Sequence, residues 1–228
     1  MIKRLPIIIF IFIIFYLYFK DDVFKNKTIV IGASLPTSGI IKSWGDAVTN
    51  GVNSYLNYAN ENNLIKDKKI EFLTYDDKYE PELTLENTNK LIYENNVFAL
   101  FGFVGTPTVK RVLPLLYDEN VPVFSAFTGA SFLRDKKNEN FINFRASYEQ
   151  EIEALINFLD KQKKLNKVAV FYQNDDYGEE GYISLLQALK NKDIKLVAEG
   201  SYKRNTLSIS HAFNEIKDAN PQVIFMIG

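Results

Sequence analysis

Residues 29–52 read IVIGASLPTSGIIKSWGDAVTNGV, and this stretch decides which fold the chain can adopt. It opens with an apolar run typical of a buried strand, which stops at the turn-forming residues PTSG (36–39). Polar and apolar residues then alternate with the spacing of a helix. The pattern predicts a strand, a tight loop and a helix, which is the repeating unit of an α/β protein.

The loop between this strand and helix lacks two patterns that bind phosphate groups. A dinucleotide-binding loop needs G-x-G-x-x-G directly after the strand, because the backbone must approach the pyrophosphate. The glycines here, Gly32, Gly39 and Gly45, are too far apart. A P-loop needs a Lys after its last glycine, and Ile40 follows Gly39. Two interpretations stay open from the loop alone, a connection without a ligand or a site for another small molecule.

The composition excludes several classes of protein. The chain has 228 residues, 46% of them hydrophobic, which suffices for one or two small domains with apolar cores. The net charge is −1 and the basic residues are spread along the chain, so we expect no nucleic-acid surface. The absence of cysteine excludes disulfides, zinc-thiolate sites and a lipobox. The single histidine, His211, is expected to be a solvated helix residue rather than a catalytic base.

The first 22 residues differ from the rest of the chain. MIKR is basic, and residues 5–19 form an apolar run broken only by Pro6. This arrangement is typical of a secretory signal, although the large residues 16–19 leave no small-x-small cleavage site. We therefore expect 1–22 to be a signal peptide or an uncleaved membrane anchor. The main body would lie in the periplasm or on the outer face of the cytoplasmic membrane. A buried core helix is the alternative.

Strands and helices alternate from residue 28 onward. Strands are expected at 28–35, 68–77, 97–105, 121–127, 140–146, 167–174, 194–202 and 221–228. Helices are expected at 44–62, 81–95, 106–119, 149–164, 178–191 and 206–219. Such alternation predicts parallel sheets flanked by helices. It falls into two runs, so we expect a first lobe at 28–145 and a second at 146–228.

Hydroxyl groups, backbone N–H donors and aromatic rings gather at the carboxyl ends of the predicted strands, where parallel sheets bind ligands. The motifs there are PTSG followed by Trp44, then GTPT (105–108), FTGA (127–130) and NDDYGEEG (174–181). Thr106 is expected to cap the next helix, with Pro107 at its first position. None of these groups forms a strong acid–base or metal cluster.

Four acidic residues also stand at predicted strand ends. Asp175 and Asp176 precede a helix, where a carboxylate is typically a cap. Asp76 and Asp77 end another strand and are expected to be solvated turn residues. None of the four forms a cluster typical of acid–base or metal chemistry, so we expect no catalytic residue, metal or cofactor.

Five motifs, in this order and spacing, resemble a known family. The segments VIGASLPTSG with WGDAVTNGV, YDDKYEP, FALFGFVGTPT, VPVFSAFTGA and YQNDDYGEEG are similar to those of type I periplasmic binding proteins. The resemblance is to the leucine/branched-chain amino acid-binding branch of ABC importers, and it runs from residue 29 to residue 228. It implies two α/β lobes joined by three strands, which close on a small ligand like a Venus flytrap.

The resemblance also implies roles for particular residues. Trp44 corresponds to an aromatic ring on the rim of the first lobe, and Thr106 to a Ser or Thr that binds the ligand carboxylate. A helix N-terminus offers free N–H groups and partial positive charge, which agrees with the second role. The other implied ligand-binding residues are Phe127, Thr128 and Gly129 in the first lobe, Tyr177 in the second, and Tyr148 at the crossing between them.

Three features depart from the family pattern. The apolar run 5–19 lacks a cleavage site and a lipobox. ENNLIKDKK (61–69) replaces the small residues usual after the first helix. The sequence stops after three strands of the second lobe. We therefore expect that lobe to be incomplete, with the apolar residues 224–227 exposed at its edge.

Several interpretations of function stay open. The first is the solute-binding component of an ABC importer, with a small amino acid or related carboxylate as ligand and the permease subunits as partners. The second is the sensing ectodomain of a receptor with the same fold. The third is a non-functional fragment of a binding protein. An α/β enzyme of flavodoxin-like topology is disfavoured because the sequence lacks a base, metal or phosphate motif.

Overall fold

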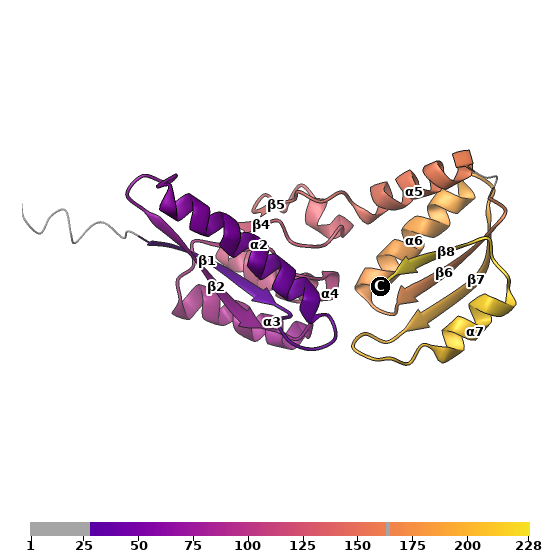
Figure 1. Ribbon diagram of the computed structural model, residues 1–228, viewed down its shortest axis with the longest axis horizontal. Helices are drawn as coiled ribbons and strands as arrows, with labels where there is room; N and C mark the ends of the chain where they lie inside the picture. Colours follow the sequence, from indigo (N-terminus) through magenta and orange to yellow (C-terminus); the bar gives the residue numbers. More distant parts are fainter. Residues whose placement is uncertain (1–27, 163–164) are drawn as a thin grey trace, which may run out of the picture.

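The computed structural model describes residues 28–162 and 165–228 (Figure 1). The predicted signal or anchor segment, 1–22, lies outside the described residues. Within the described ranges, no helix is long and apolar enough to cross a membrane. The fold is α/β, with two parallel sheets flanked by helices, as the alternation predicted.

The first sheet has five parallel strands in the order β2-β1-β3-β4-β5. The strands are β1 (Thr28–Leu35), β2 (Lys69–Asp76), β3 (Ala99–Phe101), β4 (Val123–Phe124) and β5 (Phe141–Ile142). The helices are α2 (Lys42–Glu61), α3 (Pro81–Asn89) with the π-helical turn η1 (Lys90–Glu94), α4 (Thr106–Glu119) and the 3-10 turn η2 (Ser131–Arg134). Figure 1 shows α2 on one side of this sheet and α3 and α4 on the other. This arrangement follows from right-handed crossovers between parallel strands.

The apolar runs of the sequence form the core of this part. The fully buried side chains include Leu35 of β1, Leu100 of β3, and Val112 and Leu116 of α4. Burying a side chain of this size contributes about 1.5–3 kcal/mol. The core lies between the sheet and its helices, and it leaves the carboxyl ends of the strands to form the site.

Three strands are shorter than the sequence predicted. The predicted strands 97–105, 121–127 and 140–146 are reduced to β3, β4 and β5. The reason lies in the backbone, because Gly102 and Ser125 directly after β3 and β4 have φ values of 71° and 53°. Left-handed residues cannot continue a strand. The chain therefore leaves the sheet early and forms loops, with one isolated bridge between Val104 and Phe127.

The second sheet has three parallel strands in the order β7-β6-β8. They are β6 (Lys167–Gln173), β7 (Lys195–Tyr202) and β8 (Val223–Ile227). The helices of this part are α5 (Tyr148–Gln162), α6 (Asp176–Lys190) and α7 (Ser210–Asp218). His211 is an exposed residue of α7, as expected, and its Nε2 lies 3.4 Å from Glu215 Oε1. The helix predicted to begin at residue 206 begins four residues later, at Ser210. Leu207 lies before it and is exposed in a loop.

The expectation that residues 224–227 are all exposed is half wrong. Phe225 and Ile227 are buried, whereas Ile224 and Met226 are 48% and 75% exposed. Successive side chains of a strand point to opposite faces. Phe225 and Ile227 pack in the core shared by α5 and α6, and Ile227 contacts the backbone of α6 at Gly181.

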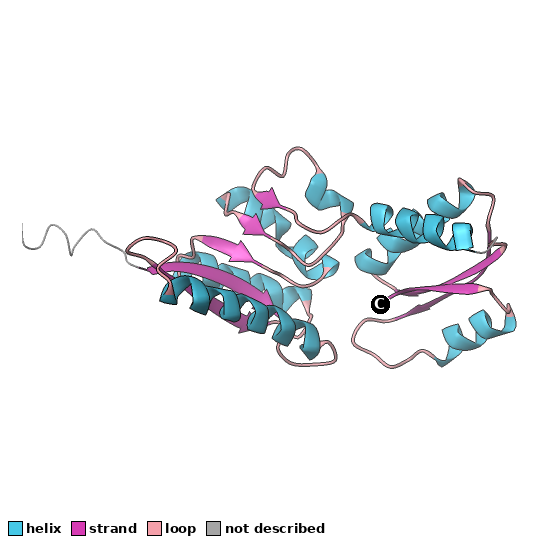
Figure 2. Ribbon diagram, turned by 45° about the horizontal axis from the view of Figure 1, so that its top comes forward, coloured by secondary structure: helices cyan, strands magenta, loops and turns pink. Residues whose placement is uncertain are grey.

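The two sheets face one another through the carboxyl ends of their strands. In Figures 1 and 2 the arrows of β1 and of β6, β7 and β8 point toward the junction between the two parts, and the chain crosses between β5 and α5. We propose 28–145 and 146–228 as the boundaries of a first and a second lobe, since β5 ends at Ile142 and α5 begins at Tyr148. Both sheets thus direct their ligand-binding ends at one place.

Candidate ligand-binding site

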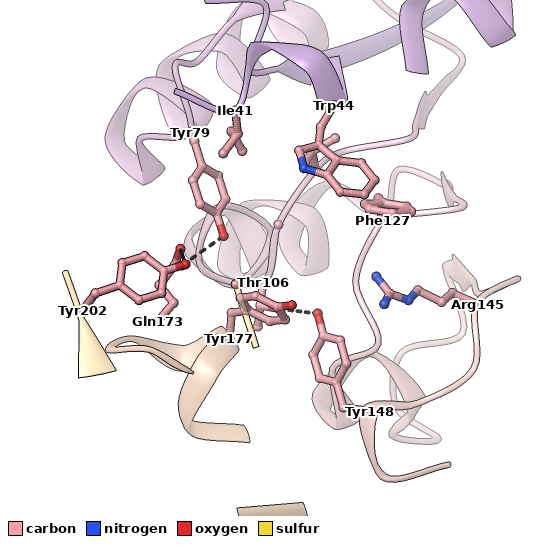
Figure 3. A pocket seen from close by; sticks show the side chains of 13 residues that line it. Ile41, Trp44, Tyr79, Thr106, Phe127, Arg145, Tyr148, Gln173, Tyr177 and Tyr202 are labelled. Atoms are coloured by element: carbon pink, nitrogen blue, oxygen red, sulfur yellow. Dashed lines mark hydrogen bonds between the residues drawn. The ribbon is translucent and has the colours of Figure 1, made fainter. Parts of the chain in front are cut away.

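A cavity of about 200 Å³ lies between the two lobes (Figure 3). The first lobe and the crossing contribute Ile41, Trp44, Tyr79, Val104, Gly105, Thr106, Phe127, Arg145 and Tyr148. The second lobe contributes Gln173, Tyr177, Tyr202 and Gly228. Six of these thirteen residues are aromatic, and among them Arg145 is the one charged residue. The cavity is therefore a largely apolar space with a few polar groups, as small-molecule sites typically are.

Three buried hydroxyl groups form the polar end of this cavity. The Thr106 Oγ1 lies 2.7 Å from the Thr128 Oγ1 and 2.9 Å from the Tyr148 OH, and the last two oxygens are also 2.9 Å apart. We call these three residues the hydroxyl cluster. Each hydroxyl group can donate one hydrogen bond and accept two, so the three satisfy one another when the cavity is empty. A ligand oxygen would compete for the same protons.

Thr106 reaches the cluster because α4 begins at this residue. The expectation that Thr106 is the N-cap, with Pro107 first in the helix, is wrong by one position, since Gly105 occupies the N-cap. Gly105 has φ 104° and ψ 145°, a conformation that is essentially restricted to glycine. A Cβ atom there would also clash with the Tyr79 ring. The N-terminus of α4, with its partial positive charge, thus points at the cavity.

Thr128 and Gly129 do not line the cavity, but they hold the Tyr148 side chain, which does. Thr128 is fully buried and accepts a hydrogen bond from the Ala130 N–H at 3.2 Å. A Cβ atom on Gly129 would lie 2.7 Å from Cδ1 of Tyr148. Gly129 therefore leaves the space in which the Tyr148 ring lies. Its place in the site is steric, and the other five residues implied by the resemblance do line the cavity.

An aromatic rim with one cation borders the cavity on the first-lobe side. The rings of Trp44 and Phe127 are 5.0 Å apart, and the Arg145 guanidinium lies 4.9 Å from the Phe127 ring. Glu151 accepts two hydrogen bonds from Arg145, at 2.8 and 3.0 Å, and these bonds raise the pKa of Arg145. The guanidinium is therefore a fixed positive charge close to the hydroxyl cluster, 5.4 Å from the Tyr148 ring.

The second lobe adds one aromatic ring from the start of a helix. Asp175 caps α6, as predicted, and accepts a hydrogen bond from the Tyr177 N–H at 3.0 Å. The Tyr177 ring lies 5.3 Å from that of Tyr148. Burial raises the pKa of Tyr177 to about 12, so its hydroxyl stays neutral and able to donate.

Four lining residues with polar side chains were missed in the sequence: Tyr79, Arg145, Gln173 and Tyr202. Gln173 and Tyr202 end β6 and β7, and Tyr79 follows β2. Applying the strand-end rule to every strand would have found these three. Arg145 lies in the crossing, where nothing in its neighbourhood signals a site. Gln173 donates a hydrogen bond to the Tyr79 OH at 3.2 Å, which closes the cavity between the lobes (Figure 3).

The loop that positions Tyr79 has a strained backbone and is held by the buried carboxylate of Asp77. Lys78 and Tyr79 both have positive φ, 54° and 62°, which is uncommon for such residues. Asp76 accepts from the Lys78 N–H at 3.1 Å and Asp77 from the Tyr79 N–H at 2.9 Å. Asp77 is fully buried and accepts from the Ser34 hydroxyl at 2.8 Å, so the expectation of a solvated residue is wrong for it. Burial raises the pKa of Asp77 to about 6.

Comparisons with known proteins agree with this geometry. The family model described as "periplasmic binding protein" matches residues 28–228. The Leu/Ile/Val-binding protein homolog 3 of Brucella melitensis is 25% identical over 201 residues, which is 88% of this chain and 54% of that protein. The crystal structure of "a possible leucine/isoleucine/valine-binding protein" from Rhodopirellula baltica has a TM-score of 0.83 at 31% identity, over 89% of this chain and 56% of that one.

A receptor-type protein matches a smaller part of this chain. Receptor-type adenylate cyclase B of Leishmania donovani is 27% identical over 138 residues, which is 57% of this chain and 10% of that protein. The chain spans about half the length of the Leu/Ile/Val-binding relative and of the solved structure. From the family match over residues 28–228, together with the fold, the chain belongs to the type I periplasmic binding proteins, in the family that includes the Leu/Ile/Val-binding proteins.

Proposed function

We propose that this chain is an extracytoplasmic solute-binding protein of an ABC importer. It would bind a small amino acid or a related carboxylate between its lobes and deliver it unchanged to the permease subunits. The observation that supports this most directly is the cavity between the lobes, which joins the hydroxyl cluster and the N-terminus of α4 to six aromatic rings. The family is periplasmic, so we place the chain in the periplasm or on the outer face of the cytoplasmic membrane.

In this proposal the carboxylate lies at the hydroxyl cluster. Thr106 and Tyr148 each hold a proton that can be redirected from the cluster to a ligand oxygen. A hydrogen bond to a charged group contributes about 1.5–3 kcal/mol, more than the neutral bond it replaces. Arg145 adds a positive charge that is held in place by Glu151. The carboxylate is therefore favoured over a neutral group at this end.

The apolar part of the ligand would lie between the rings of the two lobes. Trp44 and Phe127 form one wall and Tyr177 the other, and Thr128 and Gly129 hold the hydroxyl cluster and the Tyr148 ring in position. Each square ångström of apolar surface removed from water contributes about 25 cal/mol. Closure of the second lobe would bury the ligand on both sides.

Binding can be tested with carboxylates and their neutral amides. The thermal midpoint of the purified chain is measured with L-leucine, L-valine and benzoate, and with leucinamide, valinamide and benzamide as matched controls. We expect at least one acid to raise the midpoint while its amide does not. Equal stabilisation by acid and amide would contradict a carboxylate site. Mass spectrometry of the recovered ligand must show it unchanged, since a chemical product would contradict a binding role.

A sensing ectodomain is the second candidate function. The match to a receptor-type adenylate cyclase supports it, because that protein contains a related segment within a much longer chain. Cross-linking in cells distinguishes the importer component from the sensing ectodomain. Capture of permease subunits supports the importer, and capture of a signalling protein supports the receptor.

A further inference from the structure

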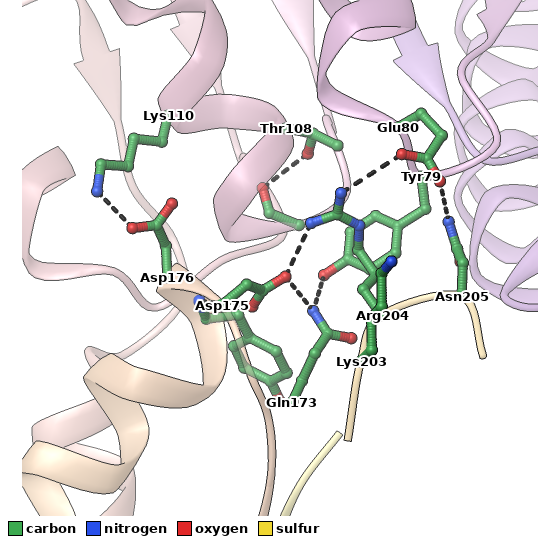
Figure 4. Close-up of polar contacts among 12 residues, drawn as sticks. Tyr79, Glu80, Thr108, Lys110, Gln173, Asp175, Asp176, Lys203, Arg204 and Asn205 are labelled. Carbon is green, nitrogen blue, oxygen red and sulfur yellow. Dashed lines mark hydrogen bonds and ion pairs between the residues drawn. The ribbon is translucent and has the colours of Figure 1, made fainter. Parts of the chain in front are cut away.

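The two lobes also meet outside the cavity, through the loop that follows β7. Figure 4 shows Arg204 and Asn205 of this loop reaching Tyr79 and Glu80 of the first lobe. Arg204 Nη2 lies 3.4 Å from Glu80 Oε2, and Asn205 Nδ2 donates to Glu80 Oε1 at 2.6 Å. The Arg204 guanidinium lies 5.6 Å from the Tyr79 ring. One arginine of the second lobe thus contacts two consecutive residues of the first.

Arg204 is held in its own lobe by Asp175. Its Nη1 donates to Asp175 Oδ2 at 2.9 Å, and the two side chains are only 21% and 13% exposed. The same carboxylate accepts from Gln173 Nε2 at 2.7 Å and from the Tyr177 N–H. Gln173 and Tyr177 both line the cavity. Asp175 therefore connects the contact between the lobes to the wall that closes over the ligand.

We propose that Arg204 is a positioning residue, which sets the closed arrangement of the lobes, and with it ligand affinity, without touching the ligand. Arginine suits this place because its planar group can bind two carboxylates at once, here Asp175 and Glu80. The pair with Glu80 exists only while the lobes are closed, so it adds to the closed state alone. A ligand that needs the closed state then binds more tightly in proportion to the fraction of closed molecules.

The proposal about closure is independent of the ligand, and only the effect on affinity rests on the proposed function. Because the chain contains no cysteine, two introduced cysteines can carry spin labels without interference. Glu86→Cys on α3 and Lys217→Cys on α7 place exposed labels on the two lobes. Pulsed electron paramagnetic resonance then gives the distribution of distances between the lobes in the otherwise unaltered 228-residue chain.

We expect Arg204→Gln to raise the ratio of open to closed molecules about two- to fivefold, the range for a partly exposed ion pair. Glu80→Gln, on the more exposed side of the pair, should have the same effect, and combining the two should add nothing further. Raising NaCl from 50 to 500 mM should open the parent chain more than Arg204→Gln, in which the ion pair between Lys110 and Asp176 still joins the two lobes and remains to be screened.

The matched control is Arg111→Gln, which breaks a bidentate pair with Glu82 inside the first lobe. This variant should keep the parent distance distribution. An unchanged distribution in both Arg204→Gln and Glu80→Gln would overturn the proposal, as would effects that add fully in the double variant. An equal shift in the control would show a general effect of charge. If none of the carboxylates tested above binds, the proposed function fails while the distance measurement still decides the role of Arg204.

Discussion

The two lobes build their sides of the cavity in different ways. In the first lobe, β3 and β4 end early, and irregular loops with positive φ carry the chain to the cavity. In the second lobe, β6 and β7 continue to Gln173 and Tyr202, which line the cavity directly. Nine of the eleven buried polar residues in the described part of the chain belong to the first lobe. Buried polar groups need partners, and in these loops Asp77 and Thr128 accept hydrogen bonds from the Tyr79 and Ala130 N–H groups.

This difference between the lobes gives each of them a different role in the site. The first lobe holds a rigid polar end, the two threonines of the hydroxyl cluster with the N-terminus of α4, whereas the second lobe supplies side chains that complete and cover it. We therefore expect substitutions in the first-lobe loops to change the site itself. Substitutions at the second-lobe wall should change mainly how well the cavity is covered.

The largest effect should come from the backbone of a first-lobe loop. Gly105→Ala places a Cβ atom at φ 104° and against the Tyr79 ring, so we expect a loss of about 3 kcal/mol of unfolding free energy. Gly51→Ala in α2 is the matched control, because its Cβ meets open space and alanine favours a helix by about 0.5–1 kcal/mol. Urea unfolding measures both. Equal stability of the two variants would show that the loop is not rigid.

Asp77 should give the first lobe a dependence on pH. Its pKa is about 6 in the folded chain, against 3.8 ordinarily, because burial disfavours the charged form. The backbone bond from Tyr79 and the hydroxyls of Ser34 and Thr84 oppose this shift, and the neighbouring Asp76 adds to it. The folded state thus binds more protons than the unfolded state between pH 4 and pH 6. Stability should therefore fall as pH rises through this window, by up to about 3 kcal/mol.

Asp77→Asn checks this prediction. Asparagine carries no charge, so the decline between pH 4 and pH 6 should disappear from urea unfolding curves. Asp76→Asn is the control, since hydrogen bonds lower the pKa of Asp76 and its contribution changes below pH 4 instead. A decline that persists in Asp77→Asn would assign it to another group.

The regular parts of both lobes could be predicted, and the first-lobe loops could not. β1 and β6 are long apolar runs between turn residues, and their pairing in parallel sheets follows from the alternation with helices. The loop at Tyr79 depends on two positive φ values that nothing in Lys78 or Tyr79 demands. Its partner Gln173 is 94 residues away, a contact that only the folded chain reveals.

The role of Thr106 in binding the ligand carboxylate gives the next prediction. It came from the resemblance and from the position at a helix start, and the structure places it in the hydroxyl cluster. Thr106→Ala should weaken carboxylate binding by about 1.5–3 kcal/mol, the contribution of a hydrogen bond to a charged group. Calorimetry measures this, with Ser54→Ala on the exposed face of α2 as the control. Unchanged affinity would remove Thr106 from the site.

The smallest expected effects compare two tyrosines that stand at the starts of α5 and α6, with their rings 5.3 Å apart. The Tyr148 hydroxyl bonds to both threonines of the hydroxyl cluster, whereas the Tyr177 hydroxyl makes no hydrogen bond within the described residues. Tyr148→Phe should therefore lower the unfolding free energy by about 1 kcal/mol, the net contribution of a buried hydrogen bond.

Tyr177→Phe keeps the ring that packs at 5.3 Å from Tyr148 and removes only its hydroxyl. We expect its effect on stability to stay below about 0.5 kcal/mol. Urea unfolding of the two variants at pH 7 gives the difference, and carboxylate affinity should follow the same order because the ligand competes for the Tyr148 proton. If Tyr177→Phe reduced affinity as much as Tyr148→Phe, the Tyr177 hydroxyl would donate a hydrogen bond to the ligand. The division between a polar end at the hydroxyl cluster and a covering wall at Tyr177 would then be wrong.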